Sequence, residues 1–84
     1  MDKKKFIQSV REFRRSFKHP RVSDLSVDEE YVCFAYNVEG STISTSVSID
    51  LSESPKLTRV YVGDKEMTFK ERPLSSIVDA VLQG

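Results

Sequence analysis

Residues 42–51 read TISTSVSIDL, and their polar and apolar side chains alternate almost without error. The apolar side chains share one parity, interrupted only by Thr45, and are Ile43, Val47, Ile49 and Leu51. Successive side chains of a β-strand point to opposite faces, so this alternation predicts a strand with one buried face and one wet face. This segment is the clearest strand in the chain and predicts that the fold is built on a sheet.

The stretches on either side of this strand predict further strands. Residues 31–38, YVCFAYNV, are rich in aromatic and β-branched residues and apolar on both sides. That composition suits a strand central in a sheet or covered on both faces. Residues 39–41, EGS, have the length of a hairpin turn. Residues 57–69 predict a tight hairpin around the two-residue connection Gly63–Asp64.

Amphipathic helices are predicted before and after the strands. Between Lys3 and Lys18 one helical stripe is apolar, and its members are Phe6, Ile7, Val10, Phe13 and Phe17. His19 stands before Pro20, and a residue in that position is pushed out of the helical region, so the first helix should stop there. After Pro73 the same spacing returns in Leu74, Ile77, Val78, Val81 and Leu82.

The predicted fold is therefore α+β, in the order helix, four-stranded antiparallel meander, helix. Short connections favour antiparallel neighbours, because parallel strands need a long crossover. We expect a two-layer sandwich with both helices on one face of the sheet, forming a single domain over residues 1–84. Residues 22–27 are interpreted as a short extended piece in the connection between the first helix and the first strand.

The chain is electrically polarised although its formal net charge is zero. Residues 1–21 hold eight positive and two negative charges, a balance of +6, and residues 22–84 hold five positive and eleven negative, a balance of −6. Such polarity suggests an anionic partner at one end, internal neutralisation, or head-to-tail self-association.

The positive charges of the first helix are the main candidate binding surface. Lys4, Arg11, Arg15 and Lys18 share the side opposite the apolar stripe, and Arg14 and Arg21 add to the cluster. A nucleic-acid backbone or an acidic protein would pair with such a surface. The alternative is a solvated helix face, partly neutralised by Glu12 and by acids on the sheet.

A second candidate surface is the edge of the sheet. If residues 31–38 form an edge strand, its uncharged side chains invite dimerisation or docking of a partner strand, and the candidate contacts are Tyr31, Cys33, Phe34 and Tyr36. If residues 22–27 pair with it, the edge is covered instead. Cys33 is expected to behave as a small buried hydrophobe. The segment KEMTF, residues 65–69, is the other candidate edge.

The sequence offers no motif for catalysis, so no catalytic, cofactor or metal-binding residue is predicted. It has one cysteine, Cys33, and one histidine, His19, without the ligand spacing of a zinc site. It has three glycines, too few and too scattered for a phosphate-binding loop. An enzyme would require an oligomer that brings two copies of His19 or of the acidic residues 28–30 together.

We therefore expect a non-enzymatic interaction module that binds a protein partner or a second copy of itself. The alternative is an RNA- or DNA-binding module that uses the basic side of the first helix. A membrane surface is less favoured as a partner, and no small-molecule substrate is evident. A single cysteine and the lack of an apolar leader segment near Lys3–Lys5 predict an intracellular location.

Overall fold

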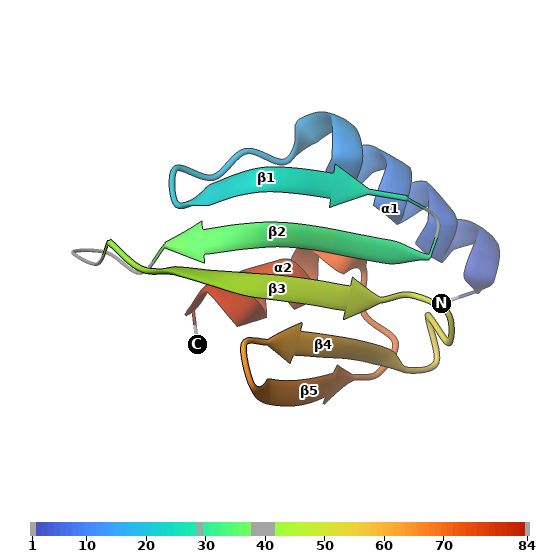
Figure 1. Ribbon diagram of the computed structural model, residues 1–84. Coiled ribbons are helices and arrows are strands. Elements are labelled where there is room, and N and C mark those ends of the chain that lie inside the picture. The colour runs from blue at the N-terminus through green and yellow to red at the C-terminus, as the bar shows by residue number, and fades with distance from the viewer. Residues whose placement is uncertain (1, 29, 38–41, 84) are drawn as a thin grey trace.

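The computed structural model describes residues 2–28, 30–37 and 42–83. The described elements follow in the order α1 (Lys3–Ser16), β1 (Val22–Val27), β2 (Tyr31–Asn37), β3 (Ser44–Asp50), β4 (Thr58–Val62), β5 (Lys65–Phe69) and α2 (Leu74–Gln83). The strands form one antiparallel sheet in the order β1-β2-β3-β4-β5, as Figure 1 shows. The α+β class and the antiparallel meander between two helices are confirmed.

The predicted number of four strands is wrong, because residues 22–27 form a fifth strand rather than an extended connection. Strand β1 pairs with β2, but its register shifts between Ser23 and Ser26, and Asp24 takes a φ of 55°. A bulge of this kind inserts a residue and breaks the two-residue period. In a regular strand, residues five positions apart point to opposite faces. Because of the bulge, Val22 and Val27 are both half-buried. The alternation by which a strand is recognised is therefore missing from this segment.

One hydrophobic core lies between the helices and one face of the sheet. It contains Phe6, Val10 and Phe13 of α1, Leu74, Ile77, Val78 and Val81 of α2, and alternate residues of β2, β3 and β4. The two helices contact each other, and in Figure 1 both lie behind the sheet. The opposite face of the sheet carries Tyr31, Cys33, Ser46 and Tyr61, which are exposed. Strand β2 therefore lies inside the sheet, between β1 and β3, but is buried on only one face.

The hairpin predicted over residues 57–69 is confirmed. Strands β4 and β5 pair in register from Thr58 opposite Phe69 to Val62 opposite Lys65. Gly63 in the connection has a φ of +58°, a conformation that side-chain-bearing residues rarely adopt. A Cβ added there would lie 3.6 Å from the Thr45 methyl group, an ordinary contact, so backbone conformation rather than crowding calls for glycine.

The boundaries of two predicted elements differ from those observed. Helix α1 ends at Ser16 rather than Lys18, because Phe17 already has extended backbone with ψ of 125°. Strand β3 begins at Ser44, and Ile43, expected on the buried side, has 74% of its surface exposed. The turn predicted at residues 39–41 lies outside the described residues.

Candidate functional site: the basic face of helix α1

Helix α1 is held in place by a cap at its start and by aromatic packing at its end. Asp2 accepts a hydrogen bond at Oδ1 from the backbone N–H of Lys5 over 2.8 Å, which satisfies one of the unpaired donors of the first turn. At the other end the rings of Phe13 and Phe17 stack with their centroids 4.5 Å apart. Phe6, Val10 and Phe13 are buried against the sheet and α2. This anchoring fixes which side of α1 faces outward.

The outward side carries the predicted binding residues. At 3.6 residues per turn, Lys4, Arg11 and Arg15 fall within an arc of about 40° on the side opposite the buried stripe. All three are exposed, as are Arg14 and Lys18, whereas Arg21, in the turn before β1, is half-buried. We call Lys4, Arg11, Arg14, Arg15 and Lys18 the basic face. Arg21 lies beyond the end of the helix and is not part of the basic face. Its backbone carbonyl oxygen accepts a hydrogen bond from the Asn37 N–H.

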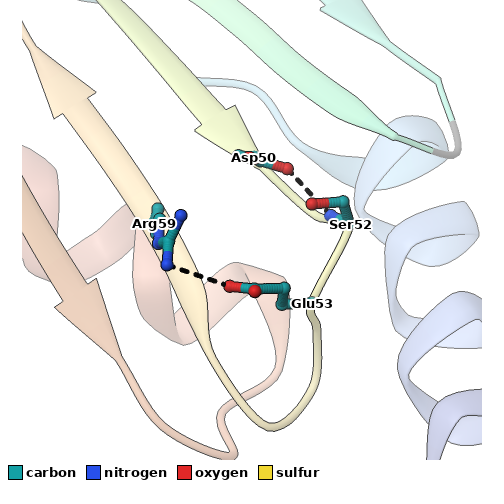
Figure 2. Close-up of polar contacts among 4 residues, drawn as sticks. All are labelled: Asp50, Ser52, Glu53 and Arg59. Atoms are coloured by element: carbon teal, nitrogen blue, oxygen red, sulfur yellow. Dashed lines mark hydrogen bonds and ion pairs between the residues drawn. The ribbon is translucent and has the colours of Figure 1, made fainter.

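None of the basic face side chains forms an ion pair with an acidic residue in the described part of the chain. The ion pair found among the described residues joins Arg59 on β4 to Glu53, with 3.4 Å between nitrogen and oxygen, as Figure 2 shows. Glu12 on α1 is exposed and pairs with none of the basic face side chains. Among the described residues, the neutralisation expected from Glu12 and from acids on the sheet is therefore not made by direct contacts.

Two acidic side chains beside the sheet accept hydrogen bonds from backbone groups instead. Asp28 accepts hydrogen bonds from the N–H groups of Glu30 and Tyr31 at 2.7 and 2.8 Å, which lowers its pKa below the ordinary value. Asp50 accepts one from the Ser52 N–H at 2.9 Å, and that bond, with the Ser52 side chain and the charge of Arg59, lowers its pKa in the same way (Figure 2). These carboxylates stabilise turns.

An open cleft of about 370 Å³ lies beside the basic face. Its apolar lining comes from Phe6, Ile7, Val10, Val27 and Leu51. Lys3, Arg11 and Arg14 line it from α1, and Asp28, Glu30 and Ser52 line it from the connections that follow β1 and β3. The cleft therefore combines an apolar surface with cations on one wall and carboxylates on the other. Lys3 and the acidic wall were not among the predicted binding residues.

A second hollow, of about 410 Å³, lies between α1 and α2, and His19 is one of the residues that line it. The His19 ring is nearly parallel to the ring of Phe17, at 6.4 Å between centroids, and its Nδ1 accepts a hydrogen bond from the Arg21 N–H. His19 therefore acts as a hydrogen-bonding residue just after the helix. Among the described residues, no three side chains of the kinds that bind metals gather into a cluster.

The four residues proposed as an edge interface do not lie at an edge. Strand β2 is paired on one side by β1 and on the other by β3, so the alternative in which residues 22–27 cover it is the one observed. Phe34 is buried and Tyr36 half-buried toward the helices. Tyr31 and Cys33 are exposed on the face of the sheet that points away from the helices, which we call the open face. The expected burial of Cys33 is wrong, because its side chain is exposed on that face.

Comparison with known proteins identifies no matching family, no matching curated protein and no matching solved structure. In the part of the chain that the structure describes, neither helix combines the length and apolar character needed to cross a membrane. The candidate site is therefore defined by its own geometry: an exposed basic face without ion pairs, continuous with a mixed-charge cleft.

Proposed function

We propose that this chain is a non-enzymatic interaction module that binds an acidic segment of a protein partner through the basic face of α1 and the adjoining cleft. The observation that carries the proposal is the cleft, in which Arg11 and Arg14 lie beside an apolar lining and opposite Asp28 and Glu30. A partner segment with acidic residues and one apolar side chain matches this arrangement. The acids would pair with the arginines and the apolar side chain would fill the cleft.

Binding of RNA or DNA through the basic face is the alternative, and the same cleft disfavours it. Asp28 and Glu30 stand beside the cations that would have to approach phosphates. Carboxylates repel a nucleic acid, which is charged at every phosphate, whereas a peptide can turn an uncharged residue toward them. The exposed tyrosines Tyr31 and Tyr61 would suit base stacking. They lie on the open face of the sheet, however, and the basic face lies on the helix layer behind it. Cations and stacking platforms therefore do not share one surface.

The proposal is tested with two glutamate-rich peptides that differ at one central position, phenylalanine in one and serine in the other. Binding is followed by NMR shifts of backbone amides at low salt. We expect shifts at Arg11 and Arg14 and along the cleft, with tighter binding of the phenylalanine peptide by about tenfold, or about 1.4 kcal/mol. Binding of neither peptide would contradict the proposal.

A matched pair of variants separates the basic face from net charge. Arg11→Glu with Arg14→Glu changes the net charge as much as Lys56→Glu with Lys70→Glu, and all four side chains are exposed. The first pair should abolish peptide binding and the second should leave it nearly unchanged. Equal losses would show that net charge alone attracts the peptide. A duplex RNA or DNA that binds more tightly than both peptides, with affinity falling steeply as salt rises, would favour the alternative.

The expected intracellular location stays a prediction. It is supported by the single cysteine of the sequence, which is exposed as a free thiol on the sheet. Reducing compartments keep such thiols free.

A further inference from the structure

The outer edge of β5 is a regular strand edge with no neighbour among the described residues. Strand β5 is the last strand of the sheet and pairs with β4 through consecutive residues without a register shift (Figure 1). It contains no proline. An edge of this kind offers backbone N–H and C=O groups to a further strand.

The opposite edge of the sheet is protected. Strand β1 has a bulge between Ser23 and Ser26, and Asp24 within it takes a φ of 55° and carries a charge. Bulges are one of the means by which proteins prevent pairing at a sheet edge. Strand β5 also carries charged side chains, Lys65 and Glu66, but it has no bulge. The two edges therefore differ, and only β5 keeps the geometry that allows a strand to be added.

The helix layer leaves part of β5 uncovered. Met67 is directly opposite Val60, which is fully buried, so both side chains point to the helix side. Met67 nevertheless has 37% of its surface exposed, and in Figure 1 neither helix passes behind β5. Phe69 is half-buried, with the Arg72 guanidinium 5.5 Å from its ring centre. Apolar side-chain surface on the helix-facing side of β5 is therefore left exposed at this edge of the sheet.

The hairpin determines which backbone groups of β5 point outward. A two-residue connection closes with a hydrogen-bonded pair, here Val62 and Lys65. Hydrogen-bonded and non-hydrogen-bonded pairs alternate along an antiparallel ladder. Lys65, Met67 and Phe69 therefore direct their backbone groups toward β4. Glu66 and Thr68 direct theirs away from the sheet.

We propose that β5 pairs antiparallel with β5 of a second copy of this chain, about a twofold axis at Met67. Glu66 then exchanges backbone hydrogen bonds with Thr68 of the second copy, and Thr68 with Glu66 of the second copy. The two Met67 side chains meet as a non-hydrogen-bonded pair, the closer of the two pair types. Each Met67 side chain covers apolar surface of the other copy that the helices leave exposed. The result is one continuous sheet across both copies, and it does not depend on the basic face.

Neighbouring registers are less favourable. Centring the axis on Glu66 would place two carboxylates directly opposite each other, which is destabilising. Centring it on Thr68 would draw in Glu71, but Glu71 has a φ of 43° and its N–H is bonded to the Pro55 carbonyl. The chain has left the strand there. The register at Met67 uses all of β5 and places no like charges opposite each other.

Sedimentation velocity across a wide concentration range tests the dimer. The unaltered chain should approach twice the monomer mass as concentration rises. Met67→Lys and Met67→Glu should each remain monomeric, because like charges would meet at the axis, and an equal mixture of the two should again form dimers. The matched control is Leu25→Lys on β1, since Leu25 is 36% exposed, almost as Met67 is. It should leave dimer formation unchanged.

The outcomes of sedimentation decide the proposal. A chain that stays monomeric at all concentrations overturns it. So does equal loss of the dimer with Leu25→Lys and Met67→Lys, or a mixture of the two Met67 variants that fails to associate.

The register is tested by disulfide formation in a Cys33→Ser background. Cα atoms of a non-hydrogen-bonded pair lie about 4.5 Å apart, and disulfides join Cα atoms about 4.4 to 6.8 Å apart. Met67→Cys should therefore give a covalent dimer under mild oxidation. Lys65→Cys should not, because the two copies of residue 65 would lie about 13 Å apart along the strands. Equal cross-linking at both positions, or more at residue 65, overturns the register.

Discussion

Tyr36 on β2 donates its phenolic hydrogen to the backbone carbonyl of Leu82, near the end of α2, over 3.1 Å. The carbonyl belongs to the last turn of the helix, where C=O groups have no partner within the helix. The hydrogen bond thus joins β2 to the last turn of α2. Tyr36 serves the contact between layers rather than the edge interface predicted for it.

Tyr36→Phe removes this hydrogen bond while keeping the ring. We expect the free energy of unfolding to fall by about 1 kcal/mol, the net value of such a bond. Urea denaturation measures the change. Tyr61→Phe is the matched control, because Tyr61 is exposed on the open face and should change stability by less than about 0.5 kcal/mol. Equal losses in the two variants would contradict the assignment.

Two isoleucines of residues 42–51 should differ sharply in their contribution to stability. Ile49 is fully buried, whereas Ile43 has 74% of its surface exposed. Ile49→Ala removes buried methyl and methylene groups and leaves a cavity, so it should cost about 2–5 kcal/mol. Ile43→Ala should change the free energy of unfolding by less than about 0.5 kcal/mol. Thermal and urea unfolding of both variants test this, and a large loss with Ile43→Ala would show that its side chain is covered.

Ser54 and Thr58 form a buried pair of hydroxyl groups, with 2.5 Å between their oxygens. Ser54→Ala should cost about 1–3 kcal/mol, because it leaves the Thr58 hydroxyl buried without this partner. Thr58→Val should cost a similar amount for the same reason. The double variant should be less destabilised than the sum of the two, which a double-mutant cycle in urea measures. Strict additivity would contradict the coupling.

Asp28 should make stability depend on acid pH. Backbone hydrogen bonds from Glu30 and Tyr31 lower the pKa of Asp28 in the folded chain below the ordinary aspartate value of 3.8. The folded state then binds fewer protons than the unfolded state, so this contribution is present above pH 3.8 and is lost as pH falls through the lower, folded-state pKa. Asp28→Asn should flatten the loss of stability below that pH. Urea unfolding across a pH series measures the slope, and an unchanged slope would contradict the role of Asp28.

Local patterns in the sequence predicted the elements with regular periods. The alternation around Val47 and Ile49 placed those side chains in the core, and the three-and-four spacing of Phe6, Val10 and Phe13 placed the buried stripe of α1. The exposure of Arg11 followed from that spacing, because buried and exposed sides of a helix are fixed together.

Predictions failed where the outcome depended on segments distant in the sequence. The bulge at Asp24 hid β1, so the sequence left open whether β2 has a free edge, and the structure shows that it has none. Cys33 was expected to be buried because its strand is apolar, but both helices lie on the other face of the sheet and Cys33 is exposed. The cleft escaped prediction because Arg14 and Glu30 are brought near each other only when α1 packs beside the connection after β1.

The sequence by itself determined the antiparallel hairpin around Gly63, the two amphipathic helices and the separation of charge along the chain. Each follows from periodicity or backbone preference within a short stretch. Only the tertiary structure decided which strands lie at the edges, which sheet face stays open and where the basic face meets an apolar cleft. Those features depend on pairing and packing between distant segments, whose free energy no local pattern contains.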